Sequence, residues 1–211
     1  MGETKCENHE EIQWGRLWTW FYRSVIALII IFGVISLITR LVLNPKNPRF
    51  TIQDATLYNF SVSSSPDLFT SVFQVTINSH NPNGKLGLYY KNLNAFATYR
   101  DQIVSEFTTI PPTYQGNNDW NIWSPFIKGI NIPISPYNVY ALNQDQANGV
   151  IPITIKIIGN LKWKALSRKW GDYDLHVTCR VLIPVGSQIQ DSFAVGKSIK
   201  YLLSVNCKVN F

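Results

Sequence analysis

The hydrophobic pattern changes once along this chain, from one long apolar run near the N-terminus to a repeated alternation of apolar and polar residues. The first run covers Ser24–Thr39 without a charge and continues through Leu41–Leu43 beyond Arg40. About 20 mostly apolar helical residues cross a bilayer core, and an arginine at the helix end can place its guanidinium among the headgroups. The pattern therefore predicts a transmembrane anchor over residues 23–43, preceded by a cytoplasmic tail, residues 1–22.

A buried core helix and a cleaved signal peptide are the alternatives for this run. A core helix rarely lacks a polar face for so long. A signal peptide has an apolar region of about 7–15 residues and a small-residue cleavage site, whereas acidic residues precede this run and Arg40–Pro45 follows it. An uncleaved anchor fits better, and tryptophans before it suit a membrane interface: Trp14, Trp18 and Trp20.

Beyond a proline-rich exit linker, residues 44–48, the hydrophobic period becomes two. Apolar residues alternate with polar ones most clearly at Phe69–Ile77 and Val150–Ile158, which predicts half-buried strands. Further β-rich runs bring the total to about seven to nine strands. These runs are Pro48–Val62, Leu86–Tyr90, Asn94–Tyr99, Ile103–Ile110, Tyr173–Val185 and Ser198–Phe211.

One short helix interrupts this β-rich pattern. Ser135 followed by Pro136 is typical of a helix N-cap and first turn, and Gly149 would end the helix. Residues 111–135 hold several prolines and are predicted to be irregular. With no βαβ rhythm, the elements predict an all-β fold, an antiparallel β-sandwich over residues 49–211 with one short helix.

The whole positive charge of the chain, a formal +6, lies in this domain, because residues 1–43 hold as many basic as acidic residues. No acidic residue occurs from Gln146 to Gly171, a stretch with five basic ones. Its alternating lysines and tryptophans would suit contact with an anionic lipid surface or an acidic polymer, such as an acidic cell-wall polysaccharide. The preferred interpretation is a sandwich hairpin with its tryptophans in the core and its lysines guarding a sheet edge. The candidate surface residues are Lys162, Trp163, Lys164, Arg168, Lys169 and Trp170.

The sequence shows no group of residues typical of an enzyme. None of His9, His80 and His176 is spaced as a metal-ligand pair, and neither a nucleophile elbow nor a phosphate-binding glycine loop occurs. The closest acids, Asp172 and Asp174, are expected in a solvated turn beside a glycine. Catalysis needs converging acids, bases or nucleophiles. We therefore expect a binding protein without a cofactor or metal, and no nucleic-acid partner.

Two features place the domain outside the cytosol, although the charges flanking the anchor give no clear orientation. Cys179 and Cys207 each lie between valines in a β-rich run, so they are predicted to share a sheet face and form a disulfide, with two buried free thiols as the alternative. Asn59 begins an N-glycosylation motif. Together they favour type II topology. Cys6 ends a near-match to a myristoylation signal, and a plain tail is the preferred interpretation.

Three motifs resemble the plant NDR/HIN-like family, the harpin-induced relatives of non-race-specific disease resistance proteins. They are the Asn-Pro-Asn turn running to two tyrosines over Asn81–Tyr90, the Gly-to-Trp-Lys pattern of Gly159–Lys164, and the terminal Cys207–Val209. The resemblance covers nearly the whole chain and implies a fibronectin-like sandwich, a late embryogenesis abundant group two domain. The segment Trp120–Trp123 departs from the family pattern, and the family offers no catalytic residues to transfer.

The resemblance also implies a single-pass plasma-membrane protein that acts in plant defence or stress responses. We expect it to work by binding or signalling through protein partners at the membrane, because a tail of residues 1–22 is too short for a signalling domain. The alternative is a structural tether between the plasma membrane and acidic cell-wall polymers.

Overall fold

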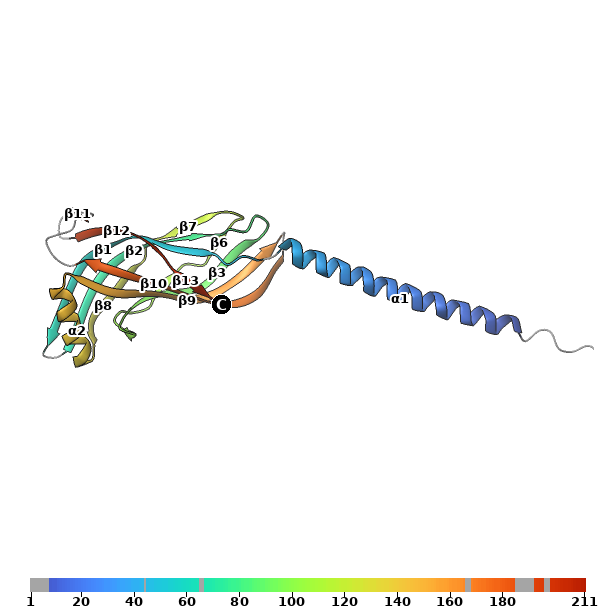
Figure 1. The fold of residues 1–211 in the computed structure, drawn as a ribbon, viewed down its shortest axis with the longest axis horizontal. Coiled ribbons are helices and arrows are strands. Elements are labelled where there is room, and N and C mark those ends of the chain that lie inside the picture. Colours follow the sequence, from blue (N-terminus) through green and yellow to red (C-terminus); the bar gives the residue numbers. More distant parts are fainter. Residues whose placement is uncertain (1–7, 44, 65–66, 166–167, 185–191, 196–197) are drawn as a thin grey trace, which may run out of the picture. The chain divides into compact units, whose positions relative to one another are not determined.

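The computed structural model describes residues 8–43, 45–64, 67–165, 168–184, 192–195 and 198–211. The chain divides into two compact units, Met1–Asn44 and Pro45–Phe211. The first unit contains one helix and the second contains the strands and a short second helix (Figure 1).

Helix α1 covers Asn8–Leu43, and its segment Trp14–Leu37 is long and apolar enough to cross a membrane. None of that segment is buried against protein, as expected for a surface that lipid would cover. The helix begins well before the predicted anchor, and residues 8–22 of the predicted tail are part of it. These residues contain no proline, and nothing in them stops the apolar helix from extending toward the N-terminus.

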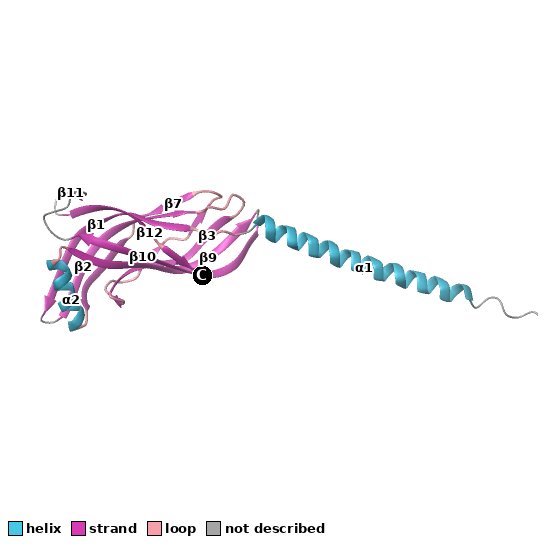
Figure 2. Cartoon of the chain, in the orientation of Figure 1, coloured by secondary structure: helices cyan, strands magenta, loops and turns pink. Residues whose placement is uncertain are grey.

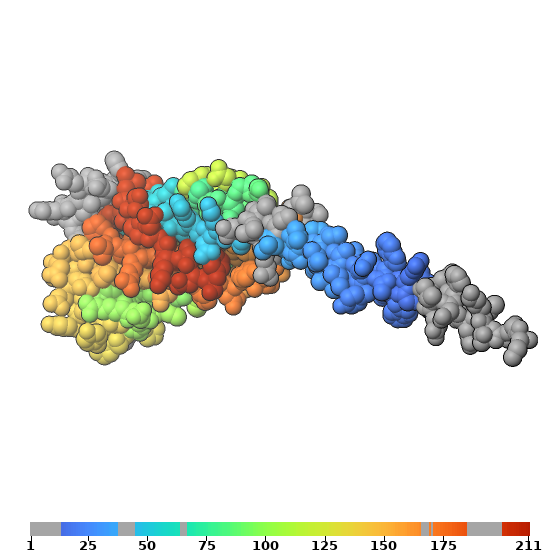
Figure 3. Space-filling view, turned by 45° about the vertical axis from the view of Figure 1, so that its right-hand side comes forward, coloured from blue at the N-terminus to red at the C-terminus, as the bar shows by residue number. Residues whose placement is uncertain are grey.

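The second unit is built from two antiparallel sheets. Sheet A has the strand order β11-β12-β1-β2-β7, and β8 also pairs with β2. In Figure 3 the C-terminal segment, in red, lies on the surface beside the cyan segment that contains β1, in agreement with the β1–β12 pairing. The strands of sheet A are β1 Arg49–Ser64, β2 Asp67–His80, β7 Trp120–Trp123, β8 Phe126–Pro133, β11 Ser192–Val195 and β12 Ser198–Asn206.

Sheet B has the order β13-β10-β9-β3-β4, and two further short strands, β5 and β6, pair with β3. Its longest pairing joins β9 and β10 in one hairpin. The strands of sheet B are β3 Gly87–Tyr99, β4 Gln102–Ile103, β5 Thr108–Ile110, β6 Thr113–Gln115, β9 Val150–Ala165, β10 Arg168–Pro184 and β13 Lys208–Asn210.

The hydrophobic core lies between the two sheets. Phe50 of sheet A packs edge-on against Tyr90 of sheet B, with ring centroids 6.0 Å apart, and stacks on Trp123. Alternate residues of β9 point into this core, as the period of two predicted; they are Ile151, Ile153, Ile155 and Ile157. The predicted all-β antiparallel β-sandwich is confirmed (Figure 2).

Helix α2, Pro136–Ala147, contacts β9 and β1 and lies at one end of the sandwich (Figures 1 and 2). The Ser135 side chain accepts a hydrogen bond from the Asn138 backbone N–H, and Pro136 occupies the first turn. Gly149 has a φ of +81° just after the helix, a conformation that favours glycine. The short helix and its signals are confirmed.

The prediction of irregular structure over residues 111–135 is wrong, because β6, β7 and β8 lie there. Their prolines stand between strands or at a strand end, such as Pro125 and Pro133, where no ladder hydrogen bond is lost. Conversely, the two runs around Lys91 form a single strand, β3, whose register shifts between Lys91 and Asn94. Such a bulge breaks the period of two without ending the strand.

Candidate functional site

The Asn-Pro-Asn turn is held by buried amide side chains. The Nδ2 group of Asn81 donates to the carbonyl oxygens of Leu86 and Gly116, at 2.7 Å each, while its Oδ1 accepts from the Asn83 backbone N–H at 3.1 Å. Asn81 has no exposed surface. A single amide therefore closes the turn and joins it to the loop before β7, since buried backbone groups need such partners.

Asn83 fixes the point at which the chain enters the sandwich. Its Nδ2 donates to the Lys46 carbonyl at 2.6 Å, and its Oδ1 accepts from the Lys46 backbone N–H at 2.7 Å. The Asn83 side chain therefore pairs with both the N–H and the C=O of Lys46, as the backbone of a neighbouring strand would. The second asparagine of the motif thus clamps the linker that follows the anchor.

The second tyrosine of the motif, Tyr90, points into the core and joins a buried polar network. Its hydroxyl donates to Gln115 Oε1 at 2.8 Å and lies 2.9 Å from Ser79 Oγ, while Gln115 Nε2 donates to the carbonyl oxygens of Ser79 and Asp119. Burial raises the pKa of Tyr90 well above its ordinary value of 10, against a smaller opposing effect of the Ser79 hydrogen bond. Tyr90 is therefore a neutral hydrogen-bonding group at any physiological pH.

The first tyrosine, Tyr89, points outward and belongs to a basic and aromatic surface on sheet B. Strand register places Tyr89 opposite Lys162 and Tyr114, and Lys164 opposite both Gly87 and Lys169. Directly paired residues of antiparallel strands project from the same face. We call this group the lysine–tyrosine surface; it comprises Tyr89, Lys91, Tyr114, Lys162, Lys164 and Lys169.

Three of these lysines lie over tyrosine rings, and Lys91 is the most distant, 5.9 Å from the centroid of Tyr89. The Nζ atom of Lys169 is 3.9 Å from the centroid of Tyr89, and that of Lys164 is 4.5 Å from the centroid of Tyr114. The electron-rich ring face attracts a cation, by about 0.5–1 kcal/mol at an exposed site. Gly87 makes room for this arrangement, because a Cβ atom there would lie 2.5 Å from the Tyr114 hydroxyl oxygen.

The charge of this surface is only partly balanced. Lys162 pairs with Asp172 at 3.0 Å, whereas no acid among the described residues pairs with Lys91, Lys164 or Lys169. Lysines directly opposite each other on neighbouring strands repel. Ring contacts reduce this repulsion without neutralising it, so an anion bound between Lys164 and Lys169 would remove an existing electrostatic cost.

The structure places the six predicted surface residues differently from one another. Lys162, Lys164 and Lys169 lie together on the lysine–tyrosine surface. Trp163 is not a surface contact: it is only 5% exposed, because alternation along β9 turns it into the core between two outward lysines. The hairpin interpretation, with a tryptophan in the core, is therefore confirmed for Trp163. Arg168 and Trp170 belong to β10, and their side chains lie outside the described part of the structure.

Cys179 and Cys207 are joined in a disulfide, with Cα atoms 4.4 Å apart. Cys179 lies in β10, whereas Cys207 lies at the break between β12 of sheet A and β13 of sheet B, not inside one long strand as the sequence suggested. The bond therefore fastens the point at which the C-terminal segment crosses from one sheet to the other. Asn59, the predicted glycosylation site, is exposed on β1.

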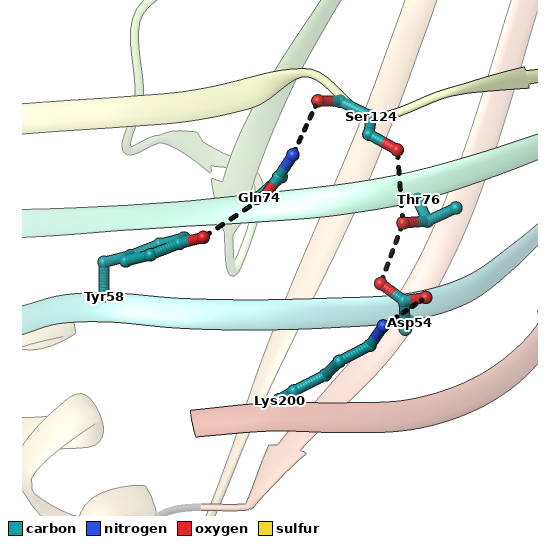
Figure 4. Close-up of polar contacts among 6 residues, drawn as sticks. All are labelled: Asp54, Tyr58, Gln74, Thr76, Ser124 and Lys200. Atoms are coloured by element: carbon teal, nitrogen blue, oxygen red, sulfur yellow. Dashed lines mark hydrogen bonds and ion pairs between the residues drawn. The ribbon is translucent and has the colours of Figure 1, made fainter. Parts of the chain in front are cut away.

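A second group of polar side chains, which the sequence analysis did not identify, lies on the outer face of sheet A (Figure 4). Thr76 donates to Asp54 at 2.8 Å and lies 3.3 Å from the Ser124 hydroxyl, and Asp54 pairs with Lys200 at 3.4 Å. We call the six labelled residues the polar ladder: Asp54, Tyr58, Gln74, Thr76, Ser124 and Lys200. They come from distant sequence positions, and only strand register brings them together.

Other titratable residues make contacts outside these two surfaces. Tyr99 donates to Asp145 at 2.6 Å, and Arg100 pairs with the same carboxylate at 3.5 Å. His80 stacks on Trp120 with ring centroids 4.0 Å apart, and Asp174 accepts a hydrogen bond from Asn160. Across the described ranges, no three His, Cys, Asp or Glu side chains lie close enough to hold a metal ion.

Comparison with known proteins agrees with the motifs just described. NDR1/HIN1-like protein 1 of Arabidopsis thaliana is 42% identical over 206 residues, covering 97% of this chain and 98% of the relative. The chain belongs to the NDR1/HIN1-like family. NDR1/HIN1-like proteins 12 and 26 of the same plant are 40% and 33% identical, covering 88% and 69% of this chain and equal shares of the relatives. No family model matches the chain.

Membership of the NDR1/HIN1-like family indicates a plant defence or stress protein, and α1 fits anchoring in a membrane. The structure also explains the motif that suggested the family. Its two asparagines close the turn and clamp the linker, its glycine admits the Tyr114 ring, and its tyrosines divide between surface and core.

Proposed function

We propose that this NDR1/HIN1-like protein is a single-pass type II protein of the plasma membrane, whose extracellular sandwich acts by binding and not by catalysis. The disulfide supports an oxidising, extracellular location, since such bonds are rare in the cytosol. The exposed sequon at Asn59 supports the same orientation. Signalling then passes through protein partners beside the anchor.

The lysine–tyrosine surface is the basis on which we propose a ligand. Its uncompensated lysines favour a polyanion, and the outer side of a plant plasma membrane faces acidic wall polysaccharide. The sequence allowed two roles, signalling through protein partners and tethering the membrane to the wall. This surface supports the tether, because it offers a site for an acidic wall polymer. Anionic lipid headgroups share the chemistry and are the competing ligand in the test below.

We expect full-length protein in nanodiscs of uncharged lipid to bind polygalacturonate, with an affinity that falls as salt is added. The double substitution Lys164→Gln/Lys169→Gln removes the two cations closest to tyrosine rings and should weaken binding at least tenfold. Lys208→Gln, an exposed lysine of sheet B outside this surface, is the control and should bind as the wild type does.

Two results would overturn this ligand assignment. One is equal binding by the double variant and the wild type. The other is binding to anionic vesicles with no binding to polygalacturonate, which would show that the ligand of this surface is lipid and not wall polymer.

The orientation is tested in cells. We predict that protease added to sealed protoplasts removes the sandwich and spares the N-terminal tail, and that endoglycosidase lowers the apparent mass of the wild type but not of Asn59→Gln. The glycan is expected because Asn59 is exposed, and type II topology would put it on the lumenal side during synthesis. A sandwich that stays protected until the membrane is broken contradicts type II topology.

A further inference from the structure

The outer face of sheet A exposes aromatic side chains at two positions near the polar ladder, one of them at its own member Tyr58. Trp120 is 56% exposed although one face of its indole stacks on His80, with an interplanar angle of 19°. Tyr58 and Phe126 are 44% and 42% exposed, and their rings lie 5.7 Å apart. Single exposed rings are ordinary, but these share one sheet face with a connected set of hydrogen-bonding groups.

Strand register gives the distance between the two aromatic positions. Trp120 pairs with His80 and Phe126 pairs with Gln74, six residues apart along β2. A strand advances about 3.3 Å per residue, so the two positions are roughly 20 Å apart. Between them lie Ile122, which pairs with Asn78 and is 61% exposed, and then Thr76 and Ser124 of the polar ladder. The whole length suits several linked sugar rings in an extended chain.

The centre of this face carries no net charge. Asp54 and Lys200 are the two ionised members of the polar ladder, and they pair at 3.4 Å. The other members are amide and hydroxyl groups, linked by hydrogen bonds from Tyr58 to Gln74 Oε1 and from Gln74 Nε2 to the Ser124 carbonyl (Figure 4). A polyanion finds no excess of cations in this centre, in contrast to the lysine–tyrosine surface.

The arrangement also differs from a typical protein interface, which has an apolar centre and a polar rim. Here hydrogen-bonding groups, with the exposed Ile122 beside them, lie between aromatic rings at the two ends. A pyranose ring matches this arrangement, because its C–H face packs on an aromatic ring while hydroxyl groups at its edge exchange hydrogen bonds with amides and hydroxyls.

We propose that the outer face of sheet A binds a neutral β-linked glucan. Trp120 and the Tyr58–Phe126 pair stack on sugar rings, and Gln74, Thr76 and Ser124 hydrogen-bond to hydroxyls between them. A β-1,4-linked chain is an extended ribbon that can follow the straight face of a sheet, whereas an α-linked chain curls away. This site is independent of the lysine–tyrosine surface, which lies on the other sheet.

Isothermal titration of deglycosylated full-length protein in uncharged nanodiscs with cellohexaose tests the proposal. The wild type should show saturable binding, and Trp120→Ala/Tyr58→Ala should weaken it at least tenfold. Both side chains are exposed, so an unchanged melting temperature checks that the fold persists. The matched control is Tyr137→Ala/Tyr140→Ala on α2, which removes two rings that are 69% and 72% exposed elsewhere, and should bind as the wild type does.

Three outcomes would overturn the proposal: no saturable binding of cellohexaose by the wild type, equal binding by the Trp120→Ala/Tyr58→Ala variant, or equal binding of maltohexaose, an α-linked chain. The Lys164→Gln/Lys169→Gln variant separates this site from the acidic-polymer function. It should lose polygalacturonate and keep cellohexaose, and the loss of both ligands would contradict two separate sites.

Discussion

Replacing both Cys179 and Cys207 by alanine is expected to lower the free energy of unfolding by about 3 kcal/mol. The bond closes a loop with a sequence separation of 28 residues, and its loss frees the unfolded chain to adopt many more conformations. For a domain of this size, such a change corresponds to a fall of roughly 6–12 °C in melting temperature. No other single link in the described structure restricts so long a segment covalently.

The position of the disulfide adds to its effect. The C-terminal segment pairs with β1 in sheet A and then, beyond Cys207, with β10 in sheet B. The short strand β13 pairs with β10 through three residues only, too few to hold the crossing point by themselves. Without the bond, β13 should detach first and β12 should follow.

Thermal unfolding, followed by tryptophan fluorescence of the full-length protein in detergent, measures this effect. Cys6, the third cysteine, is replaced by serine throughout to prevent mispairing. Reducing agent should lower the melting temperature of the parent protein to that of the alanine variant and leave the variant unchanged. A melting temperature that does not respond to reduction in the parent would show that the bond contributes nothing to stability.

The sequence predicted the parts of the fold that depend on strong local periodicity. The uninterrupted apolar run marked the anchor, and the isoleucines at every second position marked β9. Both signals depend on neighbours within one element. The failures lie where an element is short or irregular: β7 has four residues, and the bulge in β3 resembles a strand break.

Only part of the binding surfaces could be predicted, because the rest depends on contacts between strands that are distant in the sequence. Lys162, Lys164 and Lys169 are close in sequence, so their charge was visible. Their aromatic partners Tyr89 and Tyr114 come from other strands, and the register that aligns them is a property of the folded sheets. The polar ladder was missed entirely, because its members extend from β1 to β12.

The second large effect is expected at Asn81, whose replacement by alanine should destabilise the domain by about 3 kcal/mol. The substitution leaves the buried carbonyls of Leu86 and Gly116 without their donor and the Asn83 N–H without its acceptor. Each buried polar group left unpaired costs about 1–3 kcal/mol, and water entering the small cavity offsets part of the sum.

The same substitution should loosen the linker clamp. Asn83 Nδ2 donates to Asn81 Oδ1 at 2.9 Å as well as to the Lys46 carbonyl, so Asn81 orients the amide that grips the linker. Hydrogen exchange at the Lys46 backbone N–H, which donates to Asn83 Oδ1, should therefore become faster in the variant than global unfolding alone would make it. This local effect distinguishes a clamp from an ordinary buried amide.

The matched control is Asn117→Ala, which removes an exposed amide from the same loop region, bound to the Gly84 carbonyl at 3.3 Å. It should change stability by less than about 0.5 kcal/mol and leave Lys46 exchange unaltered. Melting temperature and exchange rates, measured on both variants, decide the matter. If the two variants have the same melting temperature, Asn81 does not stabilise the turn. If Lys46 exchange in Asn81→Ala is explained by global unfolding alone, Asn83 holds the linker without help from Asn81.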